Sequence, residues 1–179
     1  MTVNALTNQS TEENVKSSDF LLVKATVDPE QDLTADGKLK ISLNHAMSKL
    51  IIKITVNGTT DASMSKLGDM AINGAVVNAT CDLLAAAPAV VPAADAVVAT
   101  VAPYKGTESC ECILPPQKIA EGFSVNFSYD GKLYIWTAKE AIELEEGVEH
   151  TLTLNVNTTV RLAAKMARNW ATGQLIDRN

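Results

Sequence analysis

The chain has 179 residues, 46% of them hydrophobic and 20% charged, so it is long enough to bury a core and too apolar to be a disordered segment. Its formal net charge of −6 argues against a nucleic-acid-binding protein, which normally carries a basic face, and against docking on anionic lipid. The recurring Val, Ile and Thr residues favour pleated strands over a helical bundle.

The first 18 residues are polar and show no apolar period, so we expect residues 1–18 to form a flexible leader. Met1 is not followed by the charged and apolar regions of a signal peptide. The remaining length suits one domain, and we expect a single β-domain over residues 19–179.

Two strands are expected before residue 44. The first runs from Phe20 to Val27, because the Asp-Pro dipeptide that follows disfavours continuation. The second is half-buried, since Leu39, Ile41 and Leu43 alternate with polar residues.

The next strand shows a change of phase. Its apolar residues occupy even positions: Leu50, Ile52, Ile54 and Val56. A one-residue change of phase turns every side chain to the other face of a sheet. Residues 44–48 should therefore contain a bulge, a corner or a switch between sheets.

The middle of the chain is less regular. Residues 75–83 are a strand candidate, and residues 84–103 form an Ala/Pro-rich segment or insertion with no clear period. Residues 113–117 are expected to be an extended edge segment, because Pro115 and Pro116 cannot donate to a sheet ladder.

The last third alternates clearly. Residues 123–129 and 133–137 flank Asp130-Gly131 and predict a hairpin, and a further strand is expected over residues 151–156. Residues 160–170 fit either a helix or a strand. Short strands separated by turns favour an antiparallel sandwich.

Several short motifs resemble those of the fimbrillin family of the Bacteroidales. S-D-F-L from Ser18 is similar to the family's S-D-hydrophobic-L, and L-N-H-A-M-S-K-L from Leu43 resembles F-x-H-A-hydrophobic-S/A-K-L. I-L-P-P-Q from Ile113 and N-W-A-T-G from Asn169 resemble I-hydrophobic-P-P-Q and the closing W-x-x-G. His150 departs from the pattern, because the family has tyrosine there.

This resemblance implies an all-β fold: an antiparallel Greek-key, transthyretin-like β-sandwich that ends in a short helix or a donor strand. It implies a structural subunit, or an accessory or tip component, of bacterial surface fimbriae. Such subunits assemble by strand donation and support adhesion at the outer membrane, and their partners are other fimbrial subunits and host glycan or protein ligands. The alternative is a non-polymerising cell-surface adhesin or glycan-binding lipoprotein module.

Family members also carry a lipoprotein signal and a further β-domain before the S-D-hydrophobic-L segment. Neither is recognised in this chain, so we expect a fragment, a truncated product or a short member of the family, with membrane contact only through a lipid anchor outside it.

The resemblance also assigns structural roles to individual residues. The motif residues expected to hold the fold are His45, Ala46, Lys49, Leu50, Pro115, Pro116, Gln117, Trp136, Trp170 and Gly173. Residues 160–176 are the candidate donor strand, with the side chains of Val160, Leu162, Ala164, Met166 and Trp170 as candidates to fill the acceptor groove. An ordinary last element that completes the chain's own fold is the rival interpretation.

We expect no enzymatic activity, no cofactor and no metal site, because no catalytic or metal-binding motif is present. His45 is expected to stabilise the corner through hydrogen bonds to the backbone. Cys81, Cys110 and Cys112 are interpreted as buried thiols, since an odd number cannot all pair within one chain. Trp136 and Trp170 are either core residues or sugar-stacking platforms.

Overall fold

A computed structural model describes residues 1–179 except positions 24, 25, 27, 29, 35, 40, 59, 158–162, 167–172 and 178–179. It gives the backbone alone for residues 60, 163–166 and 173–177. Within these limits the fold is built from short strands with one α-helix and one 3₁₀ helix, as the composition predicts.

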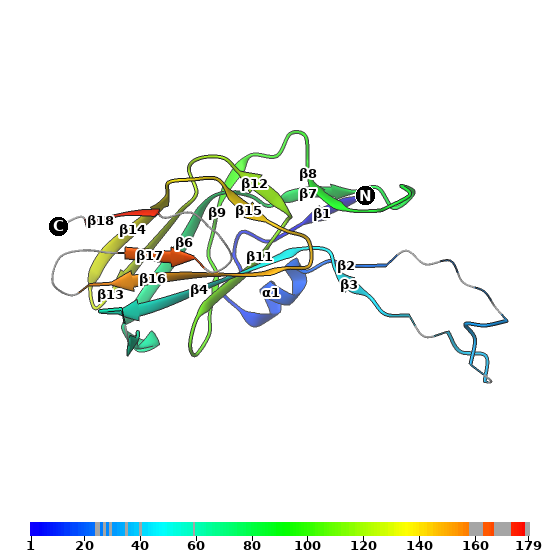
Figure 1. The fold of residues 1–179 in the computed structure, drawn as a ribbon, viewed down its shortest axis with the longest axis horizontal. Helices are drawn as coiled ribbons and strands as arrows, with labels where there is room; N and C mark the ends of the chain where they lie inside the picture. The colour runs from blue at the N-terminus through cyan, green and yellow to red at the C-terminus, as the bar shows by residue number, and fades with distance from the viewer. Residues whose placement is uncertain are drawn as a thin grey trace.

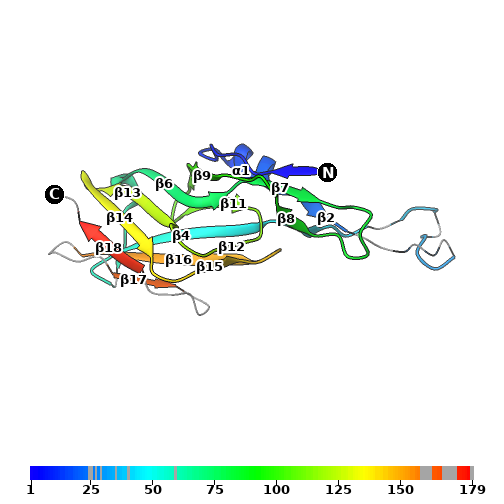
Figure 2. The same cartoon turned by 90° about the horizontal axis from the view of Figure 1, so that it is seen from above.

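Two large sheets form the body of the molecule (Figures 1 and 2). One sheet has the order β10-β11-β4-β16-β17, with β5 added to β4. Its strands are β10 (Tyr104–Lys105), β11 (Cys110–Leu114), β4 (Ser48–Val56), β16 (Glu149–Val156), β17 (Ala163–Met166) and β5 (Thr60–Asp61). The other sheet has the order β18-β14-β13-β6-β9. Its strands are β18 (Gly173–Asp177), β14 (Lys132–Ala138), β13 (Ser124–Tyr129), β6 (Leu67–Val76) and β9 (Val98–Val101).

Three small sheets and two helices extend this body. The three-stranded sheet has the order β1-β7-β8, while β12 pairs with β15 and β2 pairs with β3. These strands are β1 (Thr2–Asn4), β7 (Asn78–Cys81), β8 (Val90–Pro92), β12 (Gln117–Ile119), β15 (Ile142–Leu144), β2 (Leu21–Leu22) and β3 (Asn44–His45). The helices are α1 (Glu12–Ser18) and the 3₁₀ helix η1 (Met64–Lys66).

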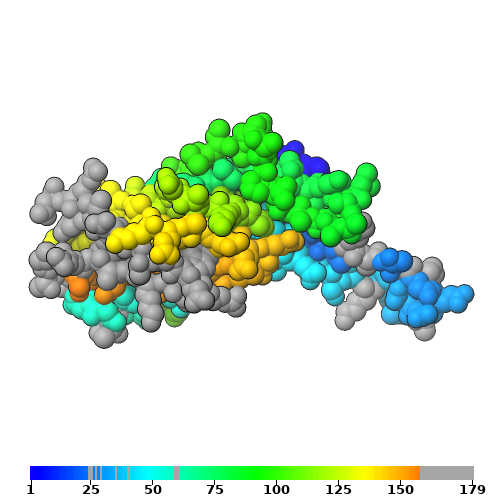
Figure 3. Space-filling model, turned by 45° about the horizontal axis from the view of Figure 1, so that its top comes forward, coloured from blue at the N-terminus to red at the C-terminus, as the bar shows by residue number. Residues whose placement is uncertain are grey.

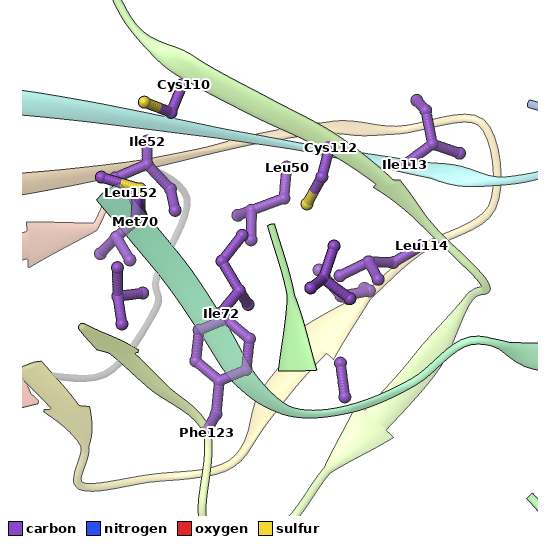
Figure 4. Packing of buried hydrophobic residues seen from close by; sticks show 14 of the residues in the cluster. Leu50, Ile52, Met70, Ile72, Cys110, Cys112, Ile113, Leu114, Phe123 and Leu152 are labelled. Atoms are coloured by element: carbon purple, nitrogen blue, oxygen red, sulfur yellow. The ribbon is translucent and has the colours of Figure 1, made fainter. Parts of the chain in front are cut away.

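The core lies between the two large sheets. Leu50 and Ile52 of β4 and Leu152 of β16 pack in one cluster with Ile72 of β6 and Phe123 (Figure 4). Each of them is at most 1% exposed. Apolar side chains meet from both inner faces, so the architecture is the expected all-β sandwich.

The corner between β3 and β4 explains the change of phase. His45 is exposed, whereas Ala46, Met47 and Ser48 are consecutively buried, which interrupts the alternation. β3 pairs with β2, while β4 joins the six-stranded sheet, so the chain switches sheets here. The backbone N–H of Ala46 donates to the carbonyl of Phe20 at 2.8 Å and fixes the corner.

The prediction of a half-buried strand before this corner is wrong. Leu39, Ile41 and Leu43 are 37%, 59% and 54% exposed, and the structure places no strand at residues 38–43 that it describes, apart from an isolated bridge between Leu33 and Leu39. The segment lies apart from the sandwich (Figures 1 and 3), so no sheet face covers its apolar side. The strand expected at residues 20–27 is reduced to β2, with positions 24, 25 and 27 outside the described residues.

The expectation of a flexible leader is also wrong. β1 pairs with β7, and Thr11 caps α1 by accepting a hydrogen bond from the backbone N–H of Asn14. Val3 and Val15 are buried in the core. The polar composition of residues 1–18 gave no sign of this strand and helix, because only one face of each short element is apolar.

The two prolines follow the end of a strand, next to a part of it that lies at a sheet edge. β11 lies between β10 and β4 inside the larger sheet, and Pro115 and Pro116 follow its last residue. However, β10 pairs with β11 at Cys110 and Glu111, whereas Ile113 and Leu114 pair with β4 alone in the described ladder. The predicted edge is therefore confirmed at these two residues, and the N–H groups that the prolines lack fall outside the ladder.

The hairpin and the C-terminal strands complete the sandwich. Asp130 and Gly131 have φ of 51° and 79°, the left-handed pair of a type I′ turn, and join β13 to β14 as predicted. Residues 163–166 form β17, so the strand alternative holds there and the helix does not. Residues 160–162 and 167–170 lie outside the described part of the chain.

Candidate functional site at the corner between strands β3 and β4

His45 pairs with a carboxylate at this corner. Its Nδ1 lies 2.6 Å from Oδ2 of Asp19, and the two side chains are 67% and 19% exposed. The pair connects β3 to Asp19, which caps the C-terminus of α1 and lies two residues before β2. The expected stabilisation of the corner is therefore made through a carboxylate and not through the backbone.

Lys49 bridges two strands beside this pair. Its Nζ lies 2.8 Å from Oε2 of Glu111 on β11 and 3.6 Å from Oε2 of Glu149 on β16. The hydrogen bond to Glu111 is the main reason that the pKa of Lys49 is raised. The Lys49 side chain is 35% exposed, so these pairs contribute at most about 1 kcal/mol. The neighbouring motif residues Ala46 and Leu50 face the core.

Gly147 brings a third part of the chain to the corner. Its N–H donates to the carbonyl of Met47 at 2.9 Å, and its φ is +66°. A Cβ at this position would lie 2.9 Å from the carbonyl oxygen of His45. Close backbone approach and a left-handed conformation together explain a glycine here.

We expect Gly147→Ala to destabilise the fold more than Gly131→Ala does. Both positions have positive φ, which costs a residue with a side chain about 1–2 kcal/mol. Only Gly147 adds a clash with the backbone of His45, because nothing lies within 4 Å of a Cβ at Gly131. Urea unfolding of the two variants measures the difference, and equal losses would contradict this account of the corner.

A cavity of about 500 Å³ opens between α1 and the corner. Its charged lining consists of Glu12, Lys16, Asp19, His45, Lys49, Glu111 and Glu149. Each of these groups pairs with another member of the set, as the described ion pairs show. The described residues include no group of three or more His, Cys, Asp or Glu side chains placed to hold a metal ion. The charged groups of the cavity therefore hold α1 and the corner together and are not left free for a ligand.

Gln117 of the P-P-Q motif connects its segment to β6 through side-chain hydrogen bonds. The Oε1 atom of Gln117 accepts a hydrogen bond from the N–H of Val76 at 2.9 Å, and its Nε2 donates to the carbonyl of Val76 at 3.0 Å. Nε2 also donates to the carbonyl of Pro115 at 3.0 Å. The side-chain amide thus satisfies both backbone groups at the end of β6, as a neighbouring strand would.

Gln9 makes the same kind of side-chain-to-backbone connection, which was not predicted from the sequence. Its Oε1 accepts from the N–H of Ile113 and its Nε2 donates to the carbonyl of Ile113, both at 2.8 Å. Nε2 also donates to the carbonyl of Leu6 at 2.9 Å, and Gln9 is fully buried. A single glutamine in a polar stretch carries no periodic signal, so only the fold reveals it.

The remaining predicted site residues are dispersed. Trp136 is fully buried on β14 and packs edge-on against Phe123 with ring centroids 6.1 Å apart, so it is a core residue and not a sugar platform. Gly173 is the first residue of β18. The backbones of Ala164 and Met166 lie in β17. Val160, Leu162 and Trp170 lie outside the described residues.

The cysteines are buried free thiols. Burial raises the pKa of Cys110 to about 11, and it raises the pKa of Cys112 further. Reactive cysteines need thiolate character and access, and these two have neither.

We expect the native thiols to resist Ellman's reagent near pH 8, while all three react in denaturant. The folded pKa values of Cys110 and Cys112 lie above the unfolded value of about 8.5, so ionisation of these two thiols increasingly favours the unfolded state as the pH rises above that value. The native state should therefore lose stability from about pH 8.5 toward 11, the value for Cys110. Rapid reaction of a thiol in the folded protein would contradict the burial described.

Comparison with known proteins places this arrangement in a family. The family model described as fimbrillin-like matches residues 1–169. The chain belongs to the fimbrillin-like family. The matched residues include the S-D, H-A-x-S-K-L and P-P-Q motifs, whose side chains make the ion pairs at the corner and the hydrogen bonds to Val76 described above.

Solved structures support the fold of this fimbrillin-like chain. A candidate cell adhesion protein from Bacteroides uniformis superposes with a TM-score of 0.53 at 16% identity, covering 75% of this chain and 51% of that one. A candidate cell adhesion protein from Bacteroides ovatus gives a TM-score of 0.52 at 16% identity, covering 87% of this chain and 60% of that one. The chain therefore spans between half and two thirds of their length. No curated protein gives a significant sequence match.

The described part of the chain has no helix of the length and hydropathy needed to cross a membrane.

Proposed function

We propose that this fimbrillin-like chain is a non-catalytic structural subunit, or an accessory or tip component, of bacterial surface fimbriae. Its place is the outer-membrane surface, its partners are related fimbrial subunits, and it assembles by strand donation. The family match carries this proposal. The adhesion described for the two Bacteroides proteins is compatible with it.

The position of the C-terminal strands supports donation as the mode of assembly. β17 is the edge strand of the six-stranded sheet and pairs antiparallel with β16, while β18 is the edge strand of the five-stranded sheet and pairs antiparallel with β14. One C-terminal segment thus supplies an outer strand to each layer. Main-chain pairing at an edge does not depend on which chain supplies the strand, so the same segment of a second copy can take this place.

One observation favours the alternative, a non-polymerising surface adhesin. Both C-terminal strands already pair within the chain, so the edges that a donor would occupy are filled. A subunit that keeps its own strands acts as a lone module or as a cap.

The proposal is tested by mixing. The purified chain, with and without residues 160–179, is incubated with protease-processed full-length fimbrillin from the same source, and the mixtures are run unboiled on SDS gels. Strand donation predicts a ladder that requires residues 160–179 and disappears on boiling.

A synthetic peptide of residues 160–179 supplies the control. Added to the shortened chain, it should restore the native circular dichroism spectrum if loss of β17 and β18 alone prevents incorporation. A stable monomer in every mixture, with the shortened chain folded by the same spectrum, would favour the lone adhesin.

A further inference from the structure

The outer face of the small sheet β1-β7-β8 carries a compact square of polar side chains. Thr2 lies opposite Thr80 and Asn4 lies opposite Asn78 in the antiparallel pairing of β1 and β7. All four are exposed, while the residues between them, Val3 and Ala79, point into the core. Alternation along two short strands therefore places two hydroxyl and two amide groups on one surface.

A turn closes one side of this square. The N–H of Ala93 donates to the carbonyl of Asn78 at 3.0 Å, and the N–H of Ala96 donates back to the carbonyl of Ala93 at 3.0 Å. This turn brings Asp95 and Val97 against the square and forms a pocket of about 380 Å³. That volume lies within the range of about 300–1,000 Å³ typical of small-molecule sites.

The polar groups of the pocket are almost unused by the protein. The only hydrogen bond described for these side chains is a long one, 3.4 Å from the N–H of Ala79 to Oδ1 of Asn4. The hydroxyls of Thr2 and Thr80, the amide of Asn78 and the carboxylate of Asp95 remain open to a ligand. Val97 adds an apolar contact and is 71% exposed.

The chemistry of this set selects a ligand class. Amides and hydroxyls both donate and accept, and a carboxylate accepts two hydrogen bonds, which suits adjacent hydroxyl groups on a ring. The pocket lining contains no Lys, Arg or His, and its one charge is negative, so anionic groups are disfavoured.

We infer that this pocket binds a neutral saccharide unit. The site lies away from the C-terminal strands, and binding there needs no polymer. Sugar binding can therefore be confirmed or contradicted independently of strand donation. Water competes for every hydrogen bond in so open a pocket, and a single sugar should bind only in the millimolar range.

The test is a titration of the ¹⁵N-labelled full chain with glucose, galactose, mannose and N-acetylglucosamine, followed in ¹H–¹⁵N correlation spectra. At least one neutral sugar should shift the amides of residues 2–4, 78–80 and 93–97, and N-acetylneuraminic acid should not. The double variant Asn78→Ala, Thr80→Val should weaken binding about tenfold, the effect of losing roughly 1.4 kcal/mol of net hydrogen bonding.

Thr151→Val is the matched control, because Thr151 is a partly exposed threonine on β16, in a different sheet. It should leave the titration unchanged, and the spectra of both variants report that they remain folded. The inference is overturned if no neutral sugar shifts the named amides, if the double variant binds as well as the control, or if only the acidic sugar binds.

Discussion

Gln9→Leu should unfold the protein at a markedly lower urea concentration. Leucine nearly keeps the volume of the side chain but leaves the N–H and the carbonyl of Ile113 without partners inside the core. Each buried group left unsatisfied costs about 1–3 kcal/mol, so we expect a loss of roughly 2–5 kcal/mol. A typical small domain has only about 5–15 kcal/mol in total.

Gln31→Leu is the matched control, because Gln31 is exposed and its change should fall within about 0.5 kcal/mol. Gln9→Glu is a second probe: it keeps the shape but replaces the donor with a charge, and it should cost at least as much as leucine. If all three variants unfolded alike, the N-terminal segment would not be part of the cooperative fold.

Trp136→Ala should be the most destabilising single truncation in the five-stranded sheet. The indole is fully buried and packs edge-on against Phe123. Removing a large buried aromatic side chain costs about 3–5 kcal/mol, since the cavity left behind closes only in part. Chemical denaturation followed by far-ultraviolet circular dichroism measures the loss without relying on tryptophan fluorescence.

Leu133→Ala tests the same strand at an exposed position. Leu133 is 51% exposed and lies three residues before Trp136 on β14, so its loss should be far smaller. Comparable losses for the two variants would contradict the assignment of Trp136 to the core and would reopen a surface role for it.

The parts of the fold that sequence predicted are those with a local cause. The even-numbered apolar residues of β4 faced the core as expected, because alternation with a period of two fixes which face a strand buries. Asp130 and Gly131 formed the predicted hairpin, because a type I′ turn requires positive φ at both central residues.

The errors came from features that depend on distant partners. Leu39, Ile41 and Leu43 alternate as well as any strand, yet alternation does not guarantee that a sheet lies opposite. The N-terminal residues looked featureless, yet Gln9 reaches a backbone more than a hundred positions away. Sequence patterns describe a segment's own preference, and these two outcomes were set by tertiary contacts.

The corner between β3 and β4 was predicted in part. The resemblance assigned structural roles to His45 and Lys49, but the carboxylates that they meet could not be named from the sequence. Asp19 is 26 positions away from His45, and Glu111 reaches Lys49 only because β11 pairs with β4. Gly147 completes the corner from a third segment for the same reason.

Strand exchange between copies is the central claim, and disulfide trapping tests it most directly. Thr153 on β16 lies opposite Lys165 on β17. Thr153→Cys and Lys165→Cys are prepared as separate proteins, mixed under assembly conditions and oxidised, while the double variant reports whether the pair can bridge within one chain. The native thiols are buried and should not compete. Strand donation predicts a disulfide-linked heterodimer in the mixture. Closure of the double variant without any intermolecular product in the mixture would contradict donation and leave a self-contained adhesin.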